Sequence, residues 1–257
     1  MTTSAISTPV SAGTPARPEP RHPNGPHAGA LAIITTALVV AAVALPGVIT
    51  GHQGYVLPTA IPGEVRAYFD TSADAARLTA LLQFAAAIPL GILTATLYAH
   101  LRRLGITVPG PSIAMFGGVA ASAAMLISTS ALYAAAELGD PARGVSGEVL
   151  SALTVLAFAA GGAGYVVPLG LLVAGVAVPA YILRLVPRPL ALAGLVVALV
   201  CEVATLDLLS HGFDPLLPIG RFGSLAWLIA VGFILPKAVR QRTGRAPARR
   251  VGASVAS

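Results

Sequence analysis

Cysteine is almost absent from this chain: among 257 residues only Cys201 occurs, and it lies within a long apolar stretch. A single cysteine excludes an internal disulfide, the cysteine-rich metal sites and the haem attachment motif. Charge is scarce as well, because Asp, Glu, Lys and Arg make up 10% of the residues, whereas soluble globular domains have about 25%. Together with a hydrophobic share of 56%, this scarcity indicates a membrane protein.

The short motifs of common catalytic sites are missing too. The chain has no HExxH, no GxSxG, no Walker loop and no GxGxxG placed between a strand and a helix. These absences favour a protein that is not an enzyme and that needs no metal or other cofactor.

Six long apolar stretches lie between residues 29 and 236. A helix needs about 20 apolar residues to cross the hydrocarbon core, and only a helix satisfies its own backbone there. We therefore predict an all-α, polytopic membrane helix bundle with six transmembrane helices. Ala42-Val43-Ala44 resembles a signal-peptidase site, but the first stretch reaches spanning length, so we expect it to stay uncleaved. The predicted spans are 29–49, 78–101, 111–136, 149–183, 189–210 and 222–236.

Basic residues alternate between the two sides of these predicted helices. Twelve of the sixteen fall on one side, which the positive-inside rule assigns to the cytoplasm. We therefore expect a multi-pass protein of the plasma membrane with both termini cytoplasmic. The other four are expected outside: Arg66, Arg77, Arg143 and Arg221. Seven acids share that outer side, either as solvated loop charge or as a rim that attracts cations: Glu64, Asp70, Asp74, Glu137, Asp140, Glu148 and Asp214.

Three segments lack a spanning apolar pattern. Residues 1–28 are rich in Pro, Ser and Thr, which predicts a disordered cytoplasmic tail before the domain of residues 29–236. Residues 50–77 are predicted to form the longest outer loop. Residues 237–257 form a basic tail that either contacts anionic lipid or serves only as a topology anchor. This tail has no aromatic residue for stacking on bases, so we expect no binding of nucleic acid.

The fourth apolar stretch is too long for one crossing. Its 35 residues would make a helix of about 52 Å, and Gly161, Gly162 and Tyr165 lie near its middle. Two full crossings would move most basic residues outside, so the charge rule rejects a seventh span. We predict a broken helix whose outer part lies at or beyond the interface. The glycines serve either close helix packing or a binding site of the kind that broken helices form in transporters.

Glu202 is the most informative polar residue, because it lies about twelve residues into the fifth stretch and therefore near the predicted midplane. No basic residue is expected at a matching depth. Either its protonated carboxyl donates a hydrogen bond to a hydroxyl or carbonyl of a neighbouring helix, or it relays protons or binds a cation. Asp207 and His211 are spaced i and i+4, which fits a pair at the helix end. A general base or metal site there would need a further ligand.

A short internal similarity suggests a parallel repeat. Pro89-Leu90-Gly91-Ile92-Leu93 is similar to Pro168-Leu169-Gly170-Leu171-Leu172, at an offset of 79 residues. Each copy is followed by a basic helix end and a Pro-x-Pro turn. The second and third helices would then repeat as the fourth and fifth, as in some transporters; chance similarity in an Ala- and Leu-rich chain is the alternative.

The last span carries a resemblance to a known family. Pro218-Ile219-Gly220-Arg221-Phe222, followed by Trp227-Leu228-Ile229-Ala230-Val231-Gly232, resembles the ending of uncharacterised six-helix bacterial integral membrane proteins grouped under a domain of unknown function. The resemblance implies a six-helix domain in a bacterial inner membrane and no established activity.

The sequence thus favours a non-enzymatic accessory, sensing or assembly component that binds lipid or another membrane protein. The alternative is a small proton-coupled transporter that uses Glu202 and the broken fourth helix. An intramembrane enzyme based on Asp207 and His211 is disfavoured by the lack of catalytic motifs.

Overall fold

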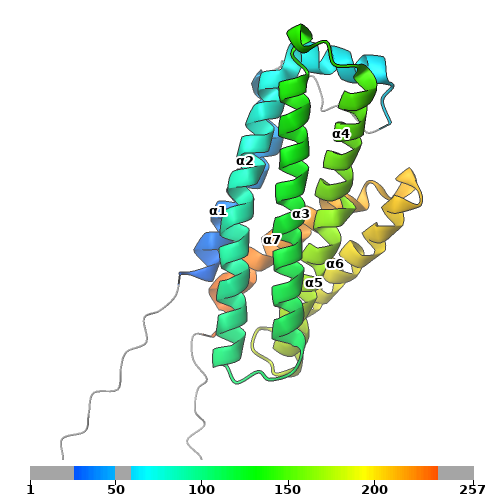
Figure 1. The fold of residues 1–257 in the computed structure, drawn as a ribbon. Coiled ribbons are helices and arrows are strands. Elements are labelled where there is room, and N and C mark those ends of the chain that lie inside the picture. Colours follow the sequence, from blue (N-terminus) through cyan, green and yellow to red (C-terminus); the bar gives the residue numbers. More distant parts are fainter. Residues whose placement is uncertain (1–25, 50–58, 237–257) are drawn as a thin grey trace, which may run out of the picture.

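The computed structural model describes residues 26–49 and 59–236, and every regular element in them is a helix (Figure 1). The predictions for residues 1–25, 50–58 and 237–257 fall outside the described residues. The elements are α1 (Ala28–Ile49), α2 (Pro62–Arg103), α3 (Gly110–Leu138), η1 (Pro141–Arg143), α4 (Gly147–Gly161), α5 (Ala163–Ile182), α6 (Arg188–Val203), η2 (Ala204–Leu208), η3 (His211–Phe213) and α7 (Leu216–Ile234).

Six spans are long and apolar enough to cross a membrane when α4 is joined to α5 and α6 to η2. This confirms the predicted six-helix bundle and indicates a multi-pass membrane protein. Large apolar side chains point outward on the bundle surface, among them Leu81, Phe116 and Val196, which are all more than 60% exposed. Such a surface suits contact with lipid tails.

The break in the fourth span is confirmed and lies at Gly162. Its φ of −82° and ψ of −111° end α4, and its carbonyl accepts the first hydrogen bonds of α5, from Tyr165 and Val166. A Cβ at Gly162 would lie 2.7 Å from the carbonyl oxygen of Phe158, so the bend leaves no room for a side chain. The 20 residues of α5 alone measure about 30 Å, enough to cross the hydrocarbon core. Figure 1 shows α4 extending beyond the end of α6, beside α2 and α3.

Two predicted boundaries are wrong. Residues 62–77 were expected in a loop, but α2 begins at Pro62 and bends at Ser72 without ending. Proline favours the first helical position, and Arg66 pairs with Asp70 one turn on, at 3.0 Å. Likewise α7 begins at Leu216, six residues before the predicted span, which places Arg221 inside the helix.

The helices pack around α5, which contacts α3, α6 and α7. The span that contains α5 is the most buried one. Of its most apolar 18 consecutive residues 61% are buried, whereas the corresponding share in every other span is at most 39%. The α3–α5 contact is close because glycines face backbone: a Cβ at Gly117 would lie 2.5 Å from the Pro168 carbonyl oxygen, and one at Gly175 would lie 2.4 Å from the Ala114 nitrogen.

The backbone supports the predicted repeat. After α2, Gly105 adopts a positive φ of 76° and the amide of Ile106 donates to Leu101; after α5, Arg184 adopts φ 53° and the amide of Leu185 donates to Ala180. Both turns are Schellman-type C-caps at an offset of 79 residues. The contacts repeat too, since α2, α3 and α4 touch one another, as do α5, α6 and α7. These features are consistent with a repeat in which α2 and α3 correspond to α5 and α6, which stays a prediction.

Candidate functional site: a cavity at the helix break

A cavity of about 510 Å³ lies beside the break and is lined by α1, α2, α3, α4 and the start of α7. Its volume falls within the roughly 300–1,000 Å³ typical of ligand pockets. Three helices line it with residues at i, i+1, i+4 and i+5, which is one helical face each. These residues are Ala42, Val43, Pro46 and Gly47 of α1, Ala157, Phe158 and Gly161 of α4 with Gly162 directly after it, and Leu217, Pro218, Arg221 and Phe222 of α7.

One face of α2 forms a long side of the cavity. Tyr68, Ala75, Thr79 and Gln83 line it over about 20 Å of helix. Thr79 donates to the carbonyl of Ala75 within its own helix, at 3.0 Å. The lining is mostly apolar, with a few polar groups, which is the usual character of a pocket for an organic ligand.

Arg221 supplies the positive charge of this lining. Its Nη2 donates to the carbonyl oxygen of Gly161 at the end of α4, and its guanidinium carbon lies 5.1 Å from the ring centre of Tyr165. Both contacts favour a cation, because a helix C-terminus carries partial negative charge and an aromatic face attracts positive charge.

The guanidinium is incompletely paired. Its Nε is buried without a hydrogen-bond partner in the described part of the chain. None of the ion pairs found among the described residues includes Arg221. The hydroxyl of Tyr165 is also buried without a partner there, and the residue is fully buried. Asp214 lines the same cavity and has an interaction of its own.

The cavity reaches the bundle surface between α1 and α7. At one end the two helices pack tightly, since a Cβ at Gly232 would lie 2.6 Å from the backbone nitrogen of Gly29. From that contact α1 and α7 diverge (Figure 1). Where they are apart, the cavity lining includes exposed apolar residues, among them Val43, exposed by 56%, and Phe222, exposed by 38%. The rim is therefore apolar and belongs to the surface that faces lipid in a membrane.

The predicted site residues are only partly brought together. Gly161 and Gly162 line the cavity, and Tyr165 lies directly behind Arg221. Glu202 does not line it: this residue is exposed, in the last turn of α6.

Asp207 is partly buried in η2 and also lies outside the cavity lining. The side chain of His211 is outside what the structure describes, so a pair between these two residues stays a prediction.

The expectation that no basic residue matches Glu202 in depth is wrong. Gly220 packs against Cys201, since a Cβ there would lie 2.9 Å from the Cys201 Sγ. Arg221 and Glu202 follow these two residues and therefore lie at neighbouring levels. They do not pair, because Glu202 is exposed whereas the guanidinium contacts Gly161 and Tyr165. Arg221 was predicted to lie in an outer loop, because a charged residue usually marks the end of an apolar stretch.

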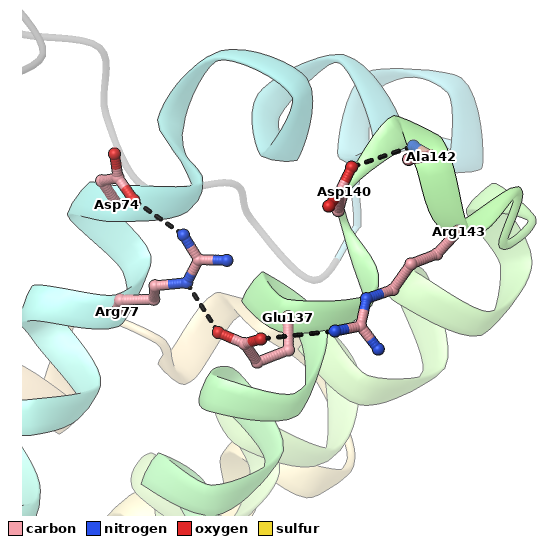
Figure 2. A network of polar contacts seen from close by, with 6 residues as sticks. All are labelled: Asp74, Arg77, Glu137, Asp140, Ala142 and Arg143. Atoms are coloured by element: carbon pink, nitrogen blue, oxygen red, sulfur yellow. Dashed lines mark hydrogen bonds and ion pairs between the residues drawn. The ribbon is translucent and has the colours of Figure 1, made fainter.

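Among the described residues, three of the seven acids predicted outside form ion pairs with arginines: Asp70, Asp74 and Glu137. Figure 2 shows Arg77 between Asp74, at 2.7 Å, and Glu137, at 2.8 Å, with Arg143 reaching the same Glu137 at 3.6 Å. Asp140 instead accepts a hydrogen bond from the amide of Ala142 (Figure 2). This network joins α2 to α3 and η1. No group of three or more His, Cys, Asp or Glu suited to a metal occurs among the described residues.

Comparisons of the chain with protein-family models, with curated protein sequences and with solved structures find no match. The resemblance to uncharacterised bacterial six-helix proteins therefore stays a prediction. What the fold and the cavity define is a multi-pass helical membrane protein with a pocket at a helix break.

Proposed function

We propose that this protein is a non-enzymatic membrane component, of an accessory, sensing or assembly kind, that binds an amphiphilic molecule from the surrounding bilayer. The observation that carries the proposal is the mostly apolar cavity at Gly162 with its apolar rim between α1 and α7. A ligand dissolved in the membrane would reach such a cavity sideways, without crossing water.

The size and the opening of the cavity support binding. Its volume of about 510 Å³ lies in the range of ligand pockets, and its exposed apolar rim lets a chain enter from the bilayer. An apolar chain that fills the space would gain contacts with the lining.

The proposal can be tested with a neutral, photoreactive long-chain alcohol added to the purified protein in lipid nanodiscs. Mass spectrometry should locate the label on the α1 and α7 segments that line the cavity. Ala75→Phe, which places a ring in the cavity, should reduce labelling several-fold. Val119→Phe is the control, because Val119 is 49% exposed on the outer face of α3 and lies outside the lining. Equal labelling of both variants, or label spread evenly over the lipid-facing surface, would contradict the proposal.

A carrier is the second candidate, favoured by the break at Gly162, which lies between the two units of the predicted repeat. Transporters built from repeats bind their substrates at such junctions, next to discontinuous helices. In proteoliposomes that contain a pH-sensitive dye, a proton-coupled carrier should acidify the lumen when substrate is added outside. Glu202→Gln should abolish that signal if Glu202 carries the proton, and a purely binding protein should give no signal at all.

A further inference from the structure

Arg221 lines the cavity with hydrogen-bond donors and a charge that the described residues do not fully pair. A guanidinium has five N–H donors in a planar fork, and the structure uses one of them, on the carbonyl of Gly161. The Nε donor is buried without a partner among the described residues, and no carboxylate there forms an ion pair with the group. A partly buried cation without an anion is costly, because it has lost part of its hydration and gained no opposite charge.

A purely structural role for Arg221 accounts for only part of this arrangement. Capping the end of α4 needs one donor, which a glutamine side chain also supplies. The contact with Tyr165 needs a cation but no fork, so lysine could make it as well. What arginine adds is a pair of parallel donors, the geometry that recognises carboxylate and phosphate oxygens.

The neighbouring groups leave room for such an anion. Ser128, the polar residue of α3 in the lining, donates its hydroxyl to the carbonyl of Ala157 at 2.6 Å. Asp214 is the carboxylate among the described lining residues, and none of the ion pairs found there joins it to Arg221. Gln83 faces the cavity from α2 and could donate an amide hydrogen to an anionic oxygen.

We propose that the cavity selects an amphiphile with an anionic head group, a carboxylate or a phosphate, and that Arg221 binds this head group while the apolar chain leaves between α1 and α7. The inference rests on the proposed function and adds the class of ligand to it. The chain would follow the α2 face from Gln83 and pass Val43 and Phe222 at the rim.

The experiment compares three compounds for displacement of the photoreactive alcohol from protein in neutral phosphatidylcholine nanodiscs: oleic acid, oleyl alcohol and lysophosphatidate. The two oleyl compounds differ only in the head group, and lysophosphatidate tests a phosphate on the same chain. We expect the acid to compete at least about tenfold better than the alcohol, a difference of about 1.4 kcal/mol. Inorganic phosphate added alone distinguishes an anionic lipid from a free anion as the ligand. It should not compete, because it has no apolar chain.

Arg221→Gln should remove this preference and leave the alcohol bound, because glutamine keeps a donor for the Gly161 carbonyl but has no charge. Arg221→Lys should retain part of the preference, as a point charge without the fork. Arg103→Gln is the matched control, since it removes the same charge from an exposed residue at the end of α2, away from the cavity. A thermal melt of each variant shows whether it is folded, and if Arg221→Gln does not fold, the lysine variant still reports the preference.

The outcomes separate the two proposals. Alcohol and acid that compete equally in the wild-type protein would overturn the anionic head group and leave the proposed function standing. A preference that survives in Arg221→Gln would overturn the role of Arg221. Failure of every compound, together with unspecific labelling, would overturn both proposals, and competition by inorganic phosphate alone would replace the amphiphile with a free anion.

Discussion

The contact between α3 and α5 offers the sharpest test of how this bundle is held together. At Gly117, a Cβ would lie 2.5 Å from both the carbonyl oxygen of Pro168 and the amide nitrogen of Leu172. Ordinary contacts of a Cβ begin near 3.4 Å, so the Gly117→Ala variant must move two helices apart by almost 1 Å. Backbone atoms in the middle of helices cannot swing aside, as the end of a side chain could.

The expected loss follows from two opposing terms. Overpacking of a core costs about 1–3 kcal/mol, and a clash with backbone belongs at the upper end of that range. Alanine regains about 1 kcal/mol through its higher helix propensity. The net destabilisation of Gly117→Ala should therefore be about 2 kcal/mol. For a protein of this size that lowers the melting temperature by about 4–8 °C.

Gly91→Ala is the matched control, because Gly91 also lies within a helix and faces α3. A Cβ there would meet only the Ser122 Oγ, at an ordinary 3.8 Å. This variant should gain about 1 kcal/mol and melt a few degrees higher. Thermal unfolding in one detergent, followed by circular dichroism, measures both. If Gly117→Ala melted at or above the wild-type temperature, the close α3–α5 contact would not exist in the protein.

Three further predictions concern other parts of the chain. Arg184→Gly should stabilise the protein by about 1 kcal/mol, because Arg184 has a left-handed φ at the position where the first repeat has Gly105; a rise in melting temperature checks this. Glu137→Gln should cost less than about 1 kcal/mol through weakened pairing with Arg77, and the loss should shrink in about 1 M salt if it is electrostatic. Glu202→Leu should leave labelling of the cavity unchanged, since Glu202 lies outside its lining; a several-fold drop would return this residue to the site.

The spans and the break could be predicted because membranes impose few and strict rules. Apolar length fixed the number of helices, and the excess length of the fourth stretch required a break. Charge parity then rejected a seventh crossing. The glycines placed the break between Gly161 and Tyr165, and the structure puts it at Gly162, where a side chain would have no room beside the Phe158 carbonyl oxygen. The predicted repeat rests on a five-residue match, and the turn at Arg184 adds a backbone feature that no sequence pattern shows.

The boundaries and the site could not be predicted so well, for a physical reason. A hydropathy scale treats every charged residue as one that prefers water. For this reason the polar residues 62–77 and Arg221 were predicted to lie in loops. In the structure, the charges of α2 are paired with one another and with α3 across the helix surface. Arg221 is held by a carbonyl and a ring. The spacing of Arg66 and Asp70 at i and i+4 was the signal for a helix, but nothing in the sequence showed that the break would face Arg221.

The break also explains why an arginine can be placed at this level. Ending α4 exposes carbonyls that no residue of the same helix can satisfy. Arg221 donates to that of Gly161, and the amide of Gly162, just after α4, donates to that of Phe158. Ser128 adds a donor to the carbonyl of Ala157 within the helix. A helix end therefore creates the negative partial charge that makes a cation tolerable, and the bend at Gly162 makes room beside it. The helix end uses only one N–H donor of Arg221. The remaining donors are those that would bind the anionic oxygens of the proposed ligand.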